Sequence, residues 1–64
     1  AIQTAQYQLL KLPEVIARTG KSGSAIYSDP TFPKPVKIGP RASAWVESEV
    51  TAWIEARIAA RQTA

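Results

Sequence analysis

The chain has 64 residues and a net charge of +3, and it contains neither cysteine nor histidine. A chain of this length forms one small domain whose core supplies about 3–5 kcal/mol of net stability. The missing cysteine and histidine argue against disulfides, thiolate catalysis, the usual metal ligands and the usual general base. No apolar run approaches the roughly 20 residues that span a bilayer, and the start of the chain lacks the features of a secretory signal. We therefore expect one cytoplasmic domain over residues 1–64, with no cofactor, metal, small-molecule substrate or membrane partner.

The first predicted element is a short helix over about residues 13–19, preceded by a flexible segment over residues 1–8. Pro13 suits the first turn of a helix, because its missing N–H would be unpaired there, and Glu14 complements the positive helix N-terminus. Gly20 supplies a left-handed exit after the last turn.

A second short helical pattern follows and ends near Ser28. Either Ser22 or Ser24 can cap its N-terminus, and Ile26 is expected to point inward. Pro30 ends the pattern, because the residue before a proline is pushed out of the helical region. The order helix, turn, helix in so small a chain is typical of nucleic-acid-binding proteins.

Closely spaced prolines predict a stiff, extended connector after the second helix. Pro30, Pro33 and Pro35 fall within six residues, which excludes both a helix and a central strand there. Phe32 is expected to be the buried anchor of this connector.

A two-stranded hairpin is predicted next. Val36 and Ile38 alternate with Lys37, and residues 42–45 follow the turn-forming run 39–41, so one face of the hairpin is expected to be covered.

The last predicted element is an amphipathic helix over about residues 47–61, with residues 62–64 expected to fray. Apolar residues recur at helical spacing at Val50, Trp53, Ile54 and Ile58, with glutamates early and arginines late. Both tryptophans, Trp45 and Trp53, are expected to pack in the core. Together the elements predict a small α+β fold.

The charged residues are segregated along the chain. Residues 11–41 carry six cations and two anions, whereas residues 42–64 carry two cations and three anions. A basic first lobe suits a polyanionic surface, although a net charge of +3 is also common among ordinary soluble domains. Tyr27 is ambiguous: its ring can pack while its hydroxyl reaches a phosphate.

Several ordered blocks of residues carry a family resemblance. They are Leu10-Lys11-Leu12-Pro13-Glu14 continuing to Gly20, Ser24-Ala25-Ile26-Tyr27, Phe32-Pro33-Lys34-Pro35-Val36-Lys37-Ile38-Gly39, and Ala44-Trp45 with Ser48-Glu49-Val50 and Trp53. Together they resemble the AlpA family of small phage and prophage regulators, which are similar to winged-helix excisionases. The resemblance implies a MerR-like winged helix-turn-helix domain, whose second helix enters the major groove while the hairpin wing touches the backbone or the minor groove.

The chain departs from the family pattern at the second helix. Members commonly carry a basic residue before the Ser-x-Ile-Tyr segment and another after the tyrosine, but here these positions are Gly23 and Ser28, and Asp29-Pro30 stops the helix. Either this domain reads few bases and relies on phosphate contacts and DNA shape, or it has shifted toward a protein partner.

The leading hypothesis is a phage or prophage DNA-binding regulator that acts as a transcription factor or as an accessory factor in site-specific excision. Duplex DNA is the expected partner, with an integrase or a second copy on tandem sites as further partners. The proposed DNA-binding residues are Lys21, Ser22, Gly23, Ser24, Tyr27 and Ser28 at the major groove, and Lys34, Lys37 and Arg41 on the connector and wing. Arg41 is the candidate for a narrow minor groove. The rival hypothesis is a protein-interaction module, such as an anti-repressor or a phage-encoded inhibitor. An enzyme is a distant third, because no catalytic constellation is recognisable.

Overall fold

The computed structural model describes residues 7–61, and the expectations for residues 1–6 and 62–64 lie outside this range. Within it, capping residues define both ends of the first helix. Helix α1 spans Leu12–Thr19 and begins one residue before Pro13. The Lys11 backbone N–H donates to Glu14 Oε1 at 3.2 Å. At the other end Gly20 has a φ of 76°, and its N–H donates to the Ile16 carbonyl at 2.8 Å. The predicted left-handed exit at Gly20 is confirmed.

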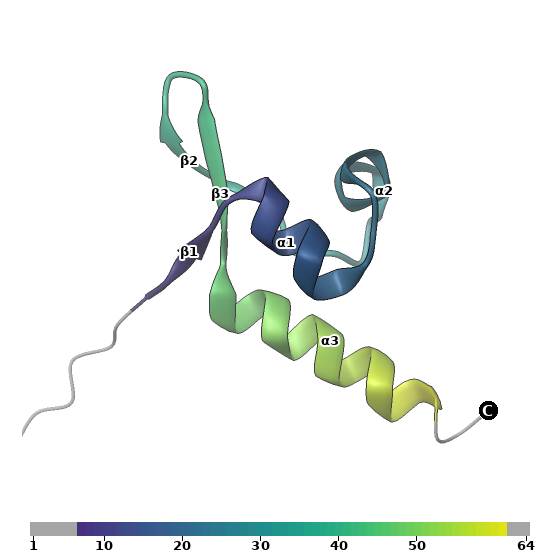
Figure 1. Ribbon diagram of the computed structural model, residues 1–64. Helices are drawn as coiled ribbons and strands as arrows, with labels where there is room; N and C mark the ends of the chain where they lie inside the picture. Colours follow the sequence, from purple (N-terminus) through teal and green to yellow (C-terminus); the bar gives the residue numbers. More distant parts are fainter. Residues whose placement is uncertain (1–6, 62–64) are drawn as a thin grey trace, which may run out of the picture.

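Helix α2 spans Gly23–Ser28 and lies beside α1 after a short polar turn (Figure 1). The cap is Ser22, whose Oγ accepts from the Ala25 N–H at 3.2 Å. Asp29 leaves the helical region with a ψ of 114°, as expected for the residue before Pro30.

The sheet has three antiparallel strands in the order β1-β3-β2. Strands β2 (Val36–Gly39) and β3 (Ala42–Val46) form the predicted hairpin. Strand β1 (Leu9–Leu10) was not expected from the sequence; its two residues pair with Val46 and Trp45 on the far side of β3.

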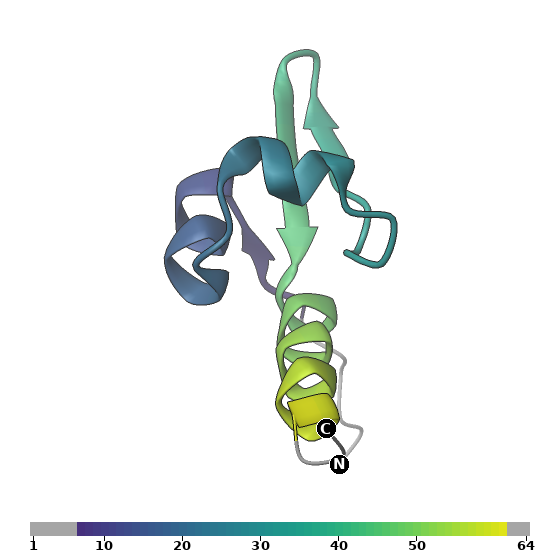
Figure 2. The same cartoon turned by 90° about the vertical axis from the view of Figure 1, so that its right-hand side faces the viewer.

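One expectation about the hairpin is wrong. Val36 and Ile38 were expected on a covered face, but 41% and 45% of their surfaces are exposed. The pairing slips between Lys37 and Gly39, so Ile38 breaks the strict alternation of faces. In addition, the hairpin projects beyond the helices, which leaves its outer half without a covering layer (Figures 1 and 2).

Helix α3 spans Glu47–Arg61 and follows β3 directly. Val50 is fully buried, whereas Ile58 is 46% exposed, so the apolar stripe predicted for this helix is covered only in its first half. The helix runs past the end of α1 (Figure 1), where no described element covers its last turns. Among the described residues, no helix is both long and apolar enough to cross a membrane.

The core lies between the sheet and the three helices, and every element except β2 contributes to it or packs on it. Its buried residues are Leu10, Val15, Ile26, Phe32, Trp45 and Val50. Phe32 and Trp45 are buried as expected, while Trp53 packs at the edge of this cluster with its ring 5.0 Å from that of Phe32. The architecture is the expected small α+β fold and is compatible with a winged helix.

Candidate nucleic-acid interface

The outer surface of α2 is made largely of hydroxyl groups. Ser22, Ser24 and Ser28 are exposed, and the Oγ atoms of Ser22 and Ser24 lie 3.5 Å apart. Gly23 is half-buried, and a Cβ built on it would meet only Leu12 Cδ2, at an ordinary contact distance of 3.5 Å. The structure therefore gathers these four predicted residues on one short helix and its cap.

The ring of Tyr27 packs against Trp45 of strand β3. The two rings meet edge to face, with centroids 5.6 Å apart and planes at 66°, yet 59% of Tyr27 is exposed. Packing therefore fixes the ring while the residue stays accessible to a partner. The expected packing of the ring is confirmed, and the contact of the hydroxyl with a phosphate stays a prediction.

Lys21 takes part in a polar cluster that joins the two ends of α2 to α3. Its Nζ lies 3.1 Å from Asp29 Oδ2 and 5.6 Å from the centre of the Trp53 ring. Asp29 Oδ1 accepts from the backbone N–H of Thr31 at 2.8 Å and from its hydroxyl at 2.7 Å. Trp53 Nε1 in turn donates to Thr31 Oγ1 at 3.3 Å. We call these four residues, Lys21, Asp29, Thr31 and Trp53, the Asp29 clamp.

The clamp changes the chemistry of Asp29. Hydrogen bonds from the hydroxyl and the backbone N–H of Thr31, followed by the contact with Lys21, lower the pKa of Asp29 from 3.8 to about 2. Asp29 is thus ionised at any physiological pH and holds Lys21 beside it. From the sequence, Asp29 was expected only to end the second helix, and Thr31 was not identified as a functional residue. The Asp-x-Thr spacing, which is typical of an Asx turn, could have indicated the contact between them.

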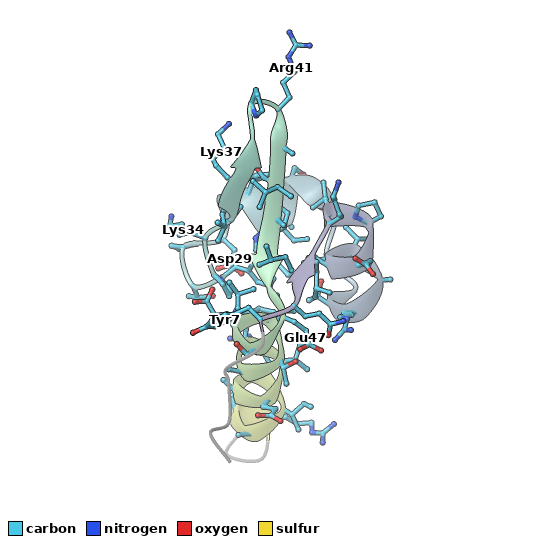
Figure 3. All side chains as sticks on the ribbon, turned by 90° about the vertical axis from the view of Figure 1, so that its left-hand side faces the viewer. Tyr7, Asp29, Lys34, Lys37, Arg41 and Glu47 are labelled. Carbon is cyan, nitrogen blue, oxygen red and sulfur yellow. The ribbon has the colours of Figure 1, made fainter. Side chains whose placement is uncertain are left out.

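The remaining predicted cations lie on the connector and the hairpin. Figure 3 shows Lys34, Lys37 and Arg41 in succession from the connector to the tip of the hairpin, where Arg41 points away from the body. All three are exposed. Within residues 7–61, the ion pairs are those of Arg18 with Glu47 at 3.4 Å and of Lys21 with Asp29, so these three cations remain unpaired there.

The predicted residues thus form two groups, which differ in chemistry. The α2 group is neutral and hydroxyl-rich, and its one cation, Lys21, is held in the Asp29 clamp. The hairpin group carries three exposed cations and no described counter-ion. In the described part of the chain, no group of three or more acidic side chains is placed to hold a metal ion.

Comparisons with known proteins place this chain among phage regulators. Protein ORF88 of Enterobacteria phage P4, itself uncharacterised, is 43% identical over 60 residues, which cover 89% of this chain and 68% of that protein. The DNA-binding transcriptional activator AlpA of Escherichia coli K12 is 34% identical over 59 residues, which cover 78% of this chain and 84% of that protein. No solved structure matches. Residues 8–58 match the family described as prophage CP4-57 regulatory protein (AlpA), and the chain belongs to this family.

Proposed function

We propose that this protein is a phage or prophage regulator that binds duplex DNA, with α2 in the major groove and the hairpin on the backbone and the minor groove. The observation that carries the proposal is the row of exposed, unpaired cations Lys34, Lys37 and Arg41 beside a helix-turn-helix, in a family of regulators. Cations without counter-ions suit a row of phosphates, because each neutralised phosphate releases condensed counterions.

The α2 surface supports the same orientation. Ser24, Tyr27 and Ser28 are exposed, and the hydroxyls of Ser24 and Tyr27 can donate to phosphate oxygens. The hydroxyl of Ser28 donates to the Ala25 carbonyl at 3.5 Å and can accept from a partner. Ser22 and Gly23 have small side chains, which would let the turn approach the DNA backbone closely. Lys21 contributes a positive charge to this end of the molecule, although the contact with Asp29 occupies it.

Transcriptional regulation is the role that we favour, because the Escherichia coli relative is described as a DNA-binding transcriptional activator. An accessory role in excision would use the same surface on attachment-site DNA beside an integrase. A domain of this size contacts about half a dozen phosphates, so a second copy on tandem sites or an integrase would raise the affinity.

Fluorescence anisotropy titrations of the protein with phage promoter and attachment-site duplexes at low salt test the proposal. We expect saturable binding that weakens steeply as salt is added. Tighter binding to promoter duplexes favours transcription, whereas tighter binding to attachment duplexes only in the presence of the integrase favours excision. Failure to bind any duplex at low salt would contradict the proposal.

One observation favours the rival function of a protein-interaction module. An open groove of about 770 Å³ runs between the connector and α3 and is lined mainly by apolar side chains, among them Pro33, Pro35, Ala52, Trp53 and Ala56. Size-exclusion chromatography of mixtures with candidate host repressors, run beside the DNA titrations, separates the two functions. Co-elution with a repressor without any DNA binding would favour the rival.

A further inference from the structure

Helix α2 lacks the side chains that distinguish one base pair from another most strongly. Bidentate contacts to base edges come from Arg, Lys, Asn and Gln, while Asp and Glu accept from cytosine. The sequence of α2 is Gly-Ser-Ala-Ile-Tyr-Ser, which contains none of these residues. Serine and tyrosine hydroxyls contact bases and phosphates alike, so α2 can position the domain but discriminates bases weakly.

The charged residues on either side of α2 do not fill this gap. Lys21 and Asp29 lie 3.1 Å apart, and each is less than a quarter exposed. Thr31 occupies the other carboxylate oxygen of Asp29. A base contact by either residue would have to break the Asp29 clamp, and Pro30 prevents α2 from extending to bring in further side chains.

The hairpin tip, in contrast, carries Arg41, which has no ion pair among the described residues and lies far enough from α2 to reach a neighbouring groove of the DNA. Gly39 pairs with Ala42, so Pro40 and Arg41 form the two-residue turn at the tip. The five residues of β3 span about 16 Å. One turn of DNA rises about 34 Å, so the groove next to the one that holds α2 lies roughly half that distance away. Arg41 can therefore meet the adjacent minor groove while α2 occupies the major groove.

We propose that Arg41 at the hairpin tip, and not α2, supplies most of the sequence discrimination of this protein, and that its preferred ligand is duplex DNA with a narrow, A·T-rich minor groove. A narrow minor groove concentrates negative potential, which attracts arginine. The guanidinium is less strongly hydrated than an ammonium and enters such a groove more readily than lysine. This inference rests on the proposed DNA binding and adds the class of site that is recognised.

Base analogues that separate the two grooves test the inference. Four otherwise identical short duplexes carry, at the position of the minor groove contact, a run of A·T pairs, G·C pairs, inosine·C pairs or diaminopurine·T pairs. Inosine removes the amino group of guanine from the minor groove, whereas diaminopurine adds one to the A·T pair, and each leaves the major-groove hydrogen-bonding pattern of its parent pair intact. We expect the A·T and inosine·C duplexes to bind about tenfold more tightly than the other two.

Variants of Arg41 test whether this residue causes the preference for the A·T and inosine·C duplexes. Arg41→Ala is expected to bind all four duplexes with similar affinity, and Arg41→Lys is expected to retain only part of the preference. Lys37→Ala and Ser24→Ala serve as matched controls, and each should weaken binding to all four duplexes by the same factor.

The outcomes separate this inference from the function on which it rests. If affinity follows the major-groove pattern, so that A·T and diaminopurine·T duplexes bind alike and differ from the other two, α2 reads the sequence and the inference is wrong. Equal binding to all four duplexes by the unmodified protein also overturns the inference but leaves DNA binding intact. Binding to none of them at low salt overturns both.

Discussion

At the scale of single residues, Asp29 makes the stability of the fold depend on pH in the acid range. Its pKa falls from 3.8 to about 2 because the folded state supplies two hydrogen bonds from Thr31 and a contact with Lys21. Between these two pH values the unfolded chain binds more protons at this group than the folded protein does. The stabilisation is therefore fully present above about pH 4 and is lost as the pH falls through about 2.

We predict that the thermal midpoint, followed by circular dichroism, falls as the pH is lowered over this range, and that Asp29→Asn reduces the fall. Asparagine can still accept from Thr31 but carries no charge to titrate. Glu14 and Glu47 also hold polar partners, so the difference between the variant and the unmodified protein isolates Asp29. Identical acid profiles for the two proteins would show that the clamp does not contribute.

The two tryptophans are predicted to differ in their importance for stability. Trp45 is 1% exposed and lies within the core, whereas Trp53 lies at its edge and keeps polar contacts to Thr31 and Lys21. Truncating a buried Trp costs about 3–5 kcal/mol, which is close to the net stability of so small a domain. Urea unfolding should show Trp45→Ala as the more damaging change, with little or no native state remaining. A higher urea midpoint for Trp45→Ala than for Trp53→Ala would contradict this order.

At the scale of elements, the sequence predicts those helix boundaries that are determined by neighbouring residues in the chain. Helix boundaries at Gly20, Ser28 and Glu47 follow from capping, proline and periodicity, and they agree with the structure within about one residue. Strand β1 was missed because two residues carry no periodic signal, and their pairing partners lie in β3, more than thirty residues later. The exposure of Val36 was missed because burial depends on what covers a strand, which alternation alone does not reveal.

In the candidate site, too, features set by local sequence could be predicted and contacts between separate segments could not. The position of the hydroxyl-rich helix and of the basic hairpin could be predicted from element order and charge. The contact between Lys21 and Asp29 could not, because it joins residues on either side of α2, and the sequence does not show how the turns at the two ends of a helix are oriented. Neighbours in space but not in sequence determine which of the predicted cations remain unpaired.

Helix α2 also supports a prediction for Gly23. This glycine has no positive φ, and a Cβ there meets only Leu12 Cδ2 at 3.5 Å, so a larger residue is tolerated without backbone strain. Gly23→Arg is expected to tighten binding to all duplexes, because it adds a cation at the candidate surface and improves helix propensity by several tenths of a kcal/mol. Anisotropy titrations beside thermal melts check both effects. A stable variant that gains no affinity on any DNA would indicate that α2 does not face nucleic acid.

At the scale of the whole molecule, the net positive charge lies toward the hairpin, because residues 34–41 carry three cations and no anion, whereas α3 carries three glutamates and two arginines. The row from Lys34 to Arg41 runs to one end of the molecule (Figure 3), while Arg18 pairs with Glu47 and Arg57 packs 5.8 Å from the centre of the Trp53 ring. Such an asymmetric field orients the protein as it approaches a polyanion, with the hairpin leading. DNA affinity should therefore depend steeply on salt, and the dependence should come from the hairpin.

Lys37→Ala tests this asymmetry quantitatively. Lys37 is exposed on β2 and unpaired among residues 7–61, so its removal should eliminate one phosphate contact and reduce the magnitude of the slope of log affinity against log salt by about one. The loss should be equal on specific and random duplexes, because a phosphate contact carries no sequence information. Arg61→Ala removes the same charge from the end of α3 and should leave the slope unchanged. Equal reductions by the two variants would mean that net charge alone, rather than the hairpin surface, determines the affinity for DNA.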